Sequence, residues 1–251
     1  MHNRDYRLSD ENNGYPVLVL GNSLGTHFSL WDQVSESLSQ RFRLLHYNPH
    51  PRPETGHRTI AARGAELLKL FDHLGLERAD FCGVSISGLL GQWLALEAPN
   101  RIRNLVLSNT AARIGNAEIW QQRIRLIDER GLAEVGDTLA GRWFSRTFAA
   151  QHPEMVERFA GQLRGYITEE YLAGCEALRD TDFRDRAEEI RVRTLIIAGS
   201  NDLAASVSDA EFLHKRIRSS QLLVLPCGHL ACVETPKAFT EAVLEFLLED
   251  H

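Results

Sequence analysis

A serine occupies a short turn whose small neighbours suit an exposed nucleophile. The run Gly83-Val84-Ser85-Ile86-Ser87-Gly88 joins an apolar stretch to a segment with helical spacing. A serine on a sharp strand-to-helix turn holds its hydroxyl free to attack a carbonyl, and small residues two positions away let the strand and the helix approach closely. Gly83 meets this need, whereas Ser87 stands where a second glycine is usual. Taken alone, the pattern could also be an ordinary turn.

An acid and a base follow two later apolar runs. Asp202 comes shortly after the run 195–198, and His229 shortly after the run 222–225. Taken singly, the aspartate could be a turn residue or a helix cap, and the histidine a satisfied core residue. Their order after Ser85 along the chain, however, is the order of the catalytic triad in α/β-hydrolases. We therefore predict a nucleophilic serine, a histidine base and an aspartate that orients the imidazole, which together perform acyl transfer to water.

Other acids and histidines fit such a triad less well. Asp209 falls within the next expected helix, and Asp180 and Asp182 belong to a separate helical region. His46 and His50 follow an earlier strand and do not lie where the base of this arrangement belongs. Because no H-E-x-x-H or similar spacing links the histidines, we expect neither a metal ion nor another cofactor.

A second glycine-containing turn, 22–26, follows the first apolar run. In α/β-hydrolases the loop at this place completes the oxyanion hole, in which backbone N–H groups hold the negative oxygen of the tetrahedral intermediate. We expect the N–H of Leu24 to act together with the N–H of Ile86. The alternative is a plain turn, because the motif carries little information.

These turns must be positioned by a framework of strands and helices, and the apolar pattern predicts one. Continuous apolar runs of strand length recur at 17–20, 44–47, 80–84, 105–107, 195–198 and 222–225. Such runs suit strands covered on both faces. Helical spacing is found over 58–75, over 86–98 and after Thr235-Pro236. The alternation predicts an α/β fold with a mostly parallel sheet flanked by helices, whose carboxyl edge collects the candidate residues.

Residues 113–190 break this alternation. They contain helical segments and no strand pair, and the segment is too long for a connecting loop between core strands. We therefore expect a helical lid over the carboxyl edge of the sheet, inserted into an α/β core formed by residues 1–112 and 191–251.

The overall composition is that of an ordinary soluble protein. The 251 residues contain 28 Lys and Arg against 34 Asp and Glu, a net charge of −6, which speaks against a nucleic-acid partner. No run of about 18 apolar residues could span a membrane, and the first residues lack the apolar core of a signal peptide. The four cysteines form no dense framework, so we expect reduced thiols in a cytoplasmic protein. A small molecule is then the expected partner, while the oligomeric state stays open.

Several stretches resemble the 3-oxoadipate enol-lactonases of the α/β-hydrolase superfamily. The matching stretches are 21–26, 81–85, 105–115, 142–144, 175–177 and 200–205. The similarity extends over nearly the whole chain from residue 15, and the N-T-A-A-R-I-G run at 109–115 is more specific to the lactonases than the triad is. The resemblance implies an α/β-hydrolase fold with a helical lid. It also implies a serine hydrolase that forms an acyl-enzyme with a small carboxylate-bearing lactone, 3-oxoadipate enol-lactone, in the β-ketoadipate pathway of aromatic catabolism.

The resemblance also directs attention to the substrate carboxylate, which arginine binds well. Arg142, Arg146 and Arg113 are candidates on the lid side, with Arg142 preferred, and Trp143 is expected to wall the substrate pocket. Each could instead be an ordinary surface or packing residue.

Three departures from the family pattern leave the exact substrate open. The family's D-x-R-G-x-G-x-S stretch is replaced by the proline-rich run 48–55, which must be more extended. Ser87 replaces a glycine, and the chain begins about one strand late, so the first edge strand is expected to be missing. The alternatives are a carboxylesterase or another α/β-hydrolase with a different ester, thioester or carbon–carbon substrate, and a non-catalytic α/β module that kept the fold.

Overall fold

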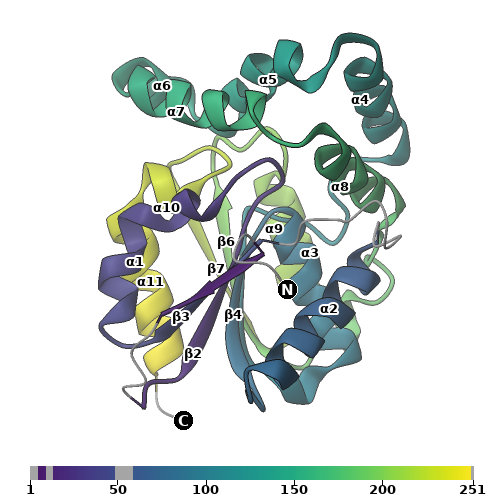
Figure 1. The fold of residues 1–251 in the computed structure, drawn as a ribbon. Helices are drawn as coiled ribbons and strands as arrows, with labels where there is room; N and C mark the ends of the chain where they lie inside the picture. Colours follow the sequence, from purple (N-terminus) through teal and green to yellow (C-terminus); the bar gives the residue numbers. More distant parts are fainter. Residues whose placement is uncertain (1–4, 10–13, 49–58, 250–251) are drawn as a thin grey trace.

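A single sheet runs through the core of the protein, whose computed structural model describes residues 5–9, 14–48 and 59–249 (Figure 1). Within these residues, the seven strands lie in the order β1-β3-β2-β4-β5-β6-β7. Their bounds are β1 (Tyr6–Leu8), β2 (Val17–Gly21), β3 (Arg43–Tyr47), β4 (Ala79–Val84), β5 (Ile102–Ser108), β6 (Arg193–Gly199) and β7 (Ser220–Leu225). Of the proline-rich run, residues 49–55, His50 among them, lie outside the described residues.

The strands from β2 onward are parallel and end level with one another. Val84 pairs with Ser108 across β4 and β5, and Ser108 pairs with Ile197 across β5 and β6. Gly199 pairs with Leu225 at the ends of β6 and β7. The carboxyl ends of four adjacent strands therefore lie along one edge of the sheet, which is where an open parallel sheet collects functional side chains. This confirms the predicted α/β fold.

A short strand, β1, precedes β2 in the chain and forms one edge of the described sheet. Tyr6 and Leu8 pair in antiparallel register with Tyr47 and Leu45 of β3. Three residues, one of them arginine, give no periodic apolar signal, so this strand is defined by its pairing and not by its own sequence. So short an edge strand also leaves few unpaired backbone groups for edge-to-edge association.

Helices cover both faces of the sheet, with α1, α10 and α11 on one face and α2, α3 and α9 on the other (Figure 1). Their bounds are α1 (Asp32–Ser39), α2 (Ile60–His73), α3 (Ile86–Glu97), α9 (Val207–Arg216), α10 (Ala231–Glu234) and α11 (Pro236–Leu248), with short 3-10 helices η1 (Phe28–Trp31) and η3 (Pro99–Arg101). Helix α2 begins where the Thr59 hydroxyl accepts the Ala62 N–H at 3.1 Å. Pro236 occupies the first turn of α11, where its missing N–H costs nothing. The helices predicted from spacing are thus present.

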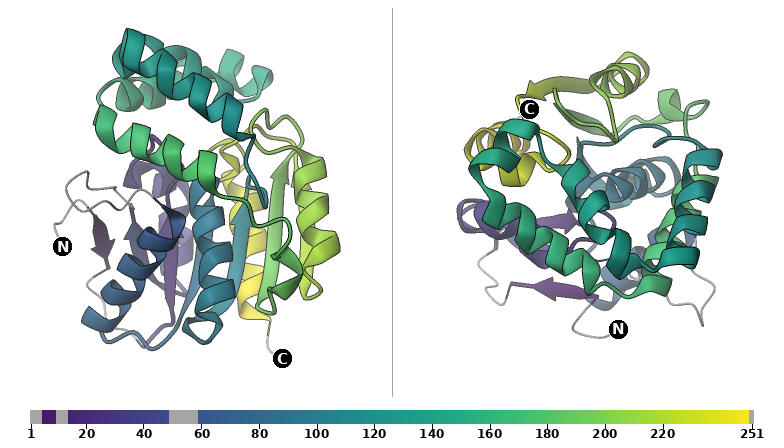
Figure 2. Two further views of the ribbon diagram at one scale, coloured as in Figure 1. Left: turned by 90° about the vertical axis from the view of Figure 1, so that its right-hand side faces the viewer. Right: turned by 90° about the horizontal axis from the view of Figure 1, so that it is seen from above.

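The chain between β5 and β6 forms a separate group of helices, here called the insertion (residues 113–190). Its elements are α4 (Ala117–Arg130), α5 (Leu132–Ala140), η4 (Gly141–Trp143), α6 (Arg146–Gln151), α7 (Pro153–Arg164), α8 (Thr168–Asp180) and η5 (Ala187–Glu189). Figure 2 shows α4 to α8 as a layer on top of the sheet, seen from the side and from above. In the described part of the chain, no helix has the length and apolar character needed to cross a bilayer.

All four cysteines are buried and free. Cys82 lies in β4 and Cys175 in α8, while Cys227 and Cys232 flank the start of α10. Burial away from water disfavours the thiolate, and it raises the pKa of Cys175 and of Cys227 to about 12. It raises the pKa of Cys82 and of Cys232 as well. None of these thiols therefore has the depressed pKa of a catalytic cysteine.

Candidate active site

Ser85 lies at the turn between β4 and α3 in a strained backbone conformation. Its φ is 57° and its ψ is −116°, which residues other than glycine rarely adopt. The N–H groups of Gly88 and Leu89 donate to the Ser85 carbonyl at 2.8 and 3.3 Å. The Ser85 N–H in turn donates to the Ser108 carbonyl of β5 at 3.0 Å. The predicted strand-to-helix turn is therefore present, and hydrogen bonds on both sides hold its strained residue.

Gly83 allows α3 to pass close to the end of β4. A Cβ at this position would collide with the backbone carbonyl of Ser87, so any side chain would push the first turn of the helix away from the strand. The glycine on the strand side of the serine is thus required by close packing. On the helix side, the fully buried Ser87 is accommodated with its side chain.

Asp202 and His229 are in direct contact. His229 Nδ1 lies 2.8 Å from Asp202 Oδ2, and both side chains are buried. The other carboxylate oxygen, Oδ1, accepts the backbone N–H groups of Ala204 and Ala205 at 2.7 and 3.1 Å. Burial by itself would raise the pKa of Asp202, but the imidazole and the hydrogen bonds outweigh it and hold the pKa below its usual value. The ionised carboxylate orients the imidazole through Nδ1, so Nε2 is the ring nitrogen that this carboxylate does not engage.

The segment that follows β5 connects the serine turn with this pair. The Asn109 side-chain amide donates to Asp202 Oδ2 at 3.2 Å and to the Gly228 carbonyl at 3.0 Å. The Thr110 hydroxyl donates to the Ser85 carbonyl at 2.8 Å. Asn109 has a φ of 49°, a left-handed conformation that asparagine tolerates better than most residues. Four adjacent strands therefore each contribute a polar residue at the same edge.

Asn109 was missed by sequence reasoning as a site residue. The available signal was an asparagine directly after an apolar run, at the edge where the acid and the base were expected. Its amide donates to the same carboxylate oxygen that contacts His229. It therefore helps to fix the rotamer of the acid.

A carboxylate from α10 fastens the loop that carries the histidine. Glu234 Oε1 accepts the backbone N–H of Gly228 at 2.8 Å, one residue before His229. The His229 N–H donates to the Trp143 carbonyl of the insertion at 2.7 Å. The backbone on which the imidazole stands is thus held from two sides, and sequence reasoning missed Glu234.

The loop after β2 lies between the serine turn and the insertion. Gly25 has a φ of +80°, and a Cβ there would lie 2.7 Å from Leu163 and 3.0 Å from Tyr171. A Cβ at Gly174 of α8 would collide with the Leu24 side chain. Helices α7 and α8 therefore pack directly on the loop whose Leu24 N–H is the expected oxyanion donor.

A cavity of about 110 Å³ lies between the insertion and the loop after β6. Residues that line it include Trp120, Arg123, Arg142, Trp143, Leu203 and Ala204. The last two directly follow Asp202. Two of the sequence-predicted substrate residues, Arg142 and Trp143, thus line one cavity together with the two residues that follow the candidate acid in the chain.

The other arginine candidates fit this cavity less well. Arg113 forms an ion pair with Asp182 at 3.4 Å, and Arg146 is exposed at the start of α6. Arg123, which sequence reasoning missed, lines the cavity with its guanidinium carbon 5.0 Å from the Trp120 ring centre. The sequence indicated only that Arg123 belongs to a helical segment of residues 113–190.

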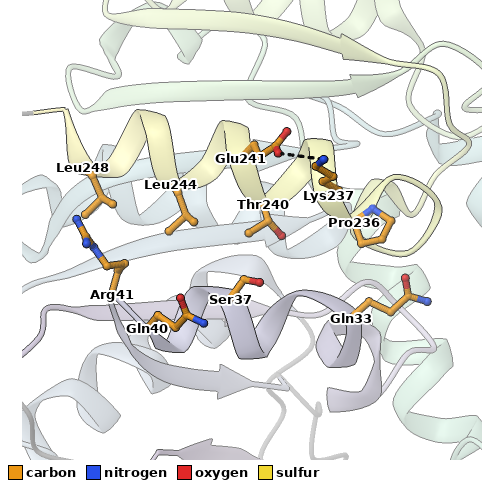
Figure 3. Close-up of a pocket in the computed structure, with 10 residues that line it drawn as sticks. All are labelled: Gln33, Ser37, Gln40, Arg41, Pro236, Lys237, Thr240, Glu241, Leu244 and Leu248. Carbon is orange, nitrogen blue, oxygen red and sulfur yellow. Dashed lines mark ion pairs between the residues drawn. The ribbon is translucent and has the colours of Figure 1, made fainter.

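A second hollow lies away from these residues. A groove of about 600 Å³ separates α1 from α11, and Figure 3 shows that the side chains along it are mostly polar. Lys237 and Glu241 pair across one turn of α11 at 3.9 Å, a weak and exposed contact. No candidate site residue lines this groove. Among the described residues, no cluster of three His, Cys, Asp or Glu side chains is arranged to hold a metal ion.

Comparison with known proteins agrees with the observed fold. A family model described as the alpha/beta hydrolase fold matches residues 16–236. The chain is 39% identical over 232 residues to 3-oxoadipate enol-lactonase 2 of Acinetobacter baylyi, covering 91% of this chain and 87% of the relative. Its fold is similar to that of the enol-lactonase from Burkholderia xenovorans LB400, with a TM-score of 0.92, 34% identity and coverage of 97% and 96% of the two chains. A hydrolase from Pseudomonas aeruginosa matches with a TM-score of 0.91, 38% identity and coverage of 97% and 94%.

Proposed function

Since the chain belongs to the alpha/beta hydrolase fold family, we propose that it is a serine hydrolase that opens a small carboxylate-bearing lactone through an acyl-enzyme. The observation that carries the proposal is the buried Asp202–His229 pair at the same sheet edge as the strained Ser85 turn. The similarity to enol-lactonases supports 3-oxoadipate enol-lactone as the substrate. The reaction class of the enzyme is then the hydrolysis of ester bonds in lactones.

In the proposed first step, Ser85 Oγ bonds to the lactone carbonyl carbon while its proton passes to His229 Nε2. The tetrahedral intermediate expels the ring oxygen, which breaks the C–O bond and leaves an ester on Ser85. The protonated imidazole returns its proton to the leaving enol oxygen, and the enol becomes a ketone. His229 then takes a proton from water as the water oxygen bonds to the ester carbon. The second tetrahedral intermediate breaks its bond to Ser85 Oγ, which takes the proton back from the imidazolium, and the carboxylic acid product is released. Asp202 stabilises the imidazolium throughout both steps.

We propose that the negative oxygen of each tetrahedral intermediate is held by the N–H groups of Leu24 and Ile86. Ile86 is the first residue of α3, so the positive end of the helix dipole adds to its donor. Losing one such donor typically lowers turnover by ~10²–10³. Because α7 and α8 pack on the Leu24 loop, we further propose that the insertion serves as the lid of the site.

For the substrate carboxylate we propose the guanidinium groups of Arg142 and Arg123. Both line the same cavity as Leu203 and Ala204, and Trp143 forms part of its wall. A planar guanidinium binds a carboxylate through two parallel hydrogen bonds. We also propose a cytoplasmic enzyme whose partner is this small molecule, because all four thiols are free and the net charge of −6 does not favour nucleic acid.

The second candidate is a carboxylesterase or another hydrolase of the same family with a different ester, thioester or carbon–carbon substrate. The observation that favours it is the proline-rich run 48–55, which replaces the glycine-containing stretch of the lactonases. We propose that such a change in sequence alters the substrate preference, while Asp202 and His229 remain in contact.

Two measurements test the proposal. A fluorophosphonate probe should label the wild-type protein at Ser85, located by peptide mass spectrometry, and the Ser85→Ala variant should remain unlabelled. Turnover of the enol-lactone is then compared with that of p-nitrophenyl acetate. Fast ester turnover without lactone turnover supports the second candidate, whereas folded protein that is neither labelled nor active overturns both.

A further inference from the structure

The Ser87 side chain makes a short hydrogen bond to the loop after β2. Its hydroxyl donates to the backbone carbonyl of Asn22 at 2.5 Å, across 65 residues of sequence. The side chain is fully buried. Ser87 lies two residues after Ser85, and Asn22 lies two residues before Leu24. The bond therefore joins the serine turn directly to the loop that carries the other expected oxyanion donor.

The space for this serine is provided by Gly21. A Cβ on Gly21 would lie 2.7 Å from the Cβ and 3.0 Å from the Oγ of Ser87, so no side chain fits at position 21 while the serine is present. With glycine at position 87, as in the usual pattern, the Asn22 carbonyl would lose this donor.

Other hydrogen bonds of the loop involve atoms other than the Asn22 carbonyl oxygen. The Asn22 side chain accepts the indole N–H of Trp31 at 2.8 Å, which fixes the side chain but not the carbonyl. Within the loop, the N–H and the hydroxyl of Thr26 both donate to the Ser23 carbonyl, at 3.1 and 2.8 Å. The loop is thus a preformed turn, and the Ser87 hydroxyl ties its first peptide to α3.

We propose that Ser87 is a positioning residue that sets the separation of the Leu24 and Ile86 N–H groups, and so holds the oxyanion hole in its productive geometry. This role rests on the proposed function, because it requires a reaction in which negative charge develops between these two groups. Ser87 does not touch the substrate. It acts by holding the two backbone segments that carry the Leu24 and Ile86 N–H groups.

The expected effect falls on the transition state and not on substrate binding. Displacing a donor costs less than removing it, so we expect Ser87→Ala to lower kcat about 10-fold with KM unchanged, against the ~10²–10³ of a lost donor. A boronic acid forms a tetrahedral adduct on the nucleophilic serine, with an oxygen in the oxyanion position. The affinity for 1-butaneboronic acid should therefore fall by the same factor as kcat.

The experiment compares Ser87→Ala, Ser87→Gly and a control, Thr194→Val. Thr194 is equally buried and also donates its hydroxyl to a backbone carbonyl, that of Val192 at 2.8 Å, but it lies in the second position of β6, far from the carboxyl edge. For each folded variant, kcat, KM, the inhibition constant of the boronic acid and the melting temperature are measured. Ser87→Gly keeps the test decisive if Ser87→Ala does not fold.

The proposal is supported if both Ser87 variants lose turnover and boronic-acid affinity in parallel while Thr194→Val loses only stability. It is overturned if the folded Ser87 variants keep both quantities within twofold of wild type, as a purely structural hydroxyl would. Fluorophosphonate labelling of the wild type separates the two levels. A labelled, active wild type with unaffected Ser87 variants overturns this role alone, whereas an unlabelled, inactive wild type overturns the proposed function and this role with it.

Discussion

The Glu234 carboxylate holds Ser145 with both of its oxygens. Oε1 accepts the Ser145 backbone N–H at 3.0 Å, and Oε2 accepts its hydroxyl at 2.7 Å, across 89 residues of sequence. Oε1 also accepts the Gly228 N–H. One side chain therefore fastens the insertion to the loop that precedes His229.

We expect Glu234→Ala to lower kcat about 10-fold and to lower the melting temperature, because two backbone N–H groups lose their acceptor and the His229 loop is released. Each unsatisfied group costs about 1–3 kcal/mol. Steady-state kinetics and thermal unfolding of the purified variant measure the two effects. Glu241→Ala is the matched control, since that glutamate is exposed on α11 and pairs weakly with Lys237. Equal kinetics in the two variants would contradict the role of Glu234.

The amide of Asn109 gives a prediction about the acid limb of the pH profile. In Asn109→Asp, a second carboxylate would face Asp202 Oδ2, and repulsion between like charges would raise the pKa of the pair. The pH at which kcat/KM falls on the acid side should therefore move upward. Asn109→Gly relieves the left-handed backbone and removes the amide without adding a charge, so it should lower kcat with a smaller upward shift. Superimposable pH profiles for wild type and Asn109→Asp would show that the amide has no influence on Asp202.

Arg142 and Arg123 should discriminate between substrates with and without a carboxylate. We expect Arg142→Leu and Arg123→Leu to raise KM for the enol-lactone about 10-fold or more, because a charged hydrogen-bond partner is lost. KM for p-nitrophenyl acetate, which has no carboxylate, should stay the same. Arg146→Leu, an exposed arginine outside the cavity, serves as the control. A uniform effect on both substrates would assign these arginines to packing.

His46 predicts a pH dependence of stability that is separate from catalysis. Burial, and next the charge of Arg7, lower the pKa of His46 to about 4 from 6.5. The folded state therefore favours the neutral imidazole. Its contribution is complete above pH 6.5 and is lost as the pH falls towards 4, by about 3 kcal/mol at most. In the wild type, the free energy of unfolding measured with urea should fall between pH 7 and pH 4. In His46→Gln this fall should be smaller.

His152→Gln is the matched control for this measurement, since His152 is an exposed histidine. The same acid-side slope in wild type and His46→Gln would assign the pH dependence to other groups.

The framework and the direct contact of the acid with the base could be predicted because their signals are local. Apolar runs that end in small residues mark the strands, and the polar residue after each run marks the carboxyl edge. Asp202 and His229 were found in this way and are in contact. The nucleophilic role of Ser85 stays a prediction, although its strained turn is present.

What could not be predicted depends on contacts between distant segments. Glu234 accepts backbone N–H groups 6 and 89 residues away, and backbone donors leave no trace in the residue type. Ser87 was noticed only as a departure, since its acceptor is a peptide carbonyl 65 residues earlier. Strand β1 exists through its pairing with β3.

The burial of all four cysteines gives the protein a built-in reporter of its own opening. While the chain is folded, a thiol-specific dye meets no accessible thiolate, since burial raises the pKa of each sulfhydryl. The rate of dye incorporation therefore measures how often the folded state opens. The sulfurs of β4 and α8 report on different layers, so peptide-resolved modification would reveal whether the sheet and the helices above it come apart together or in sequence.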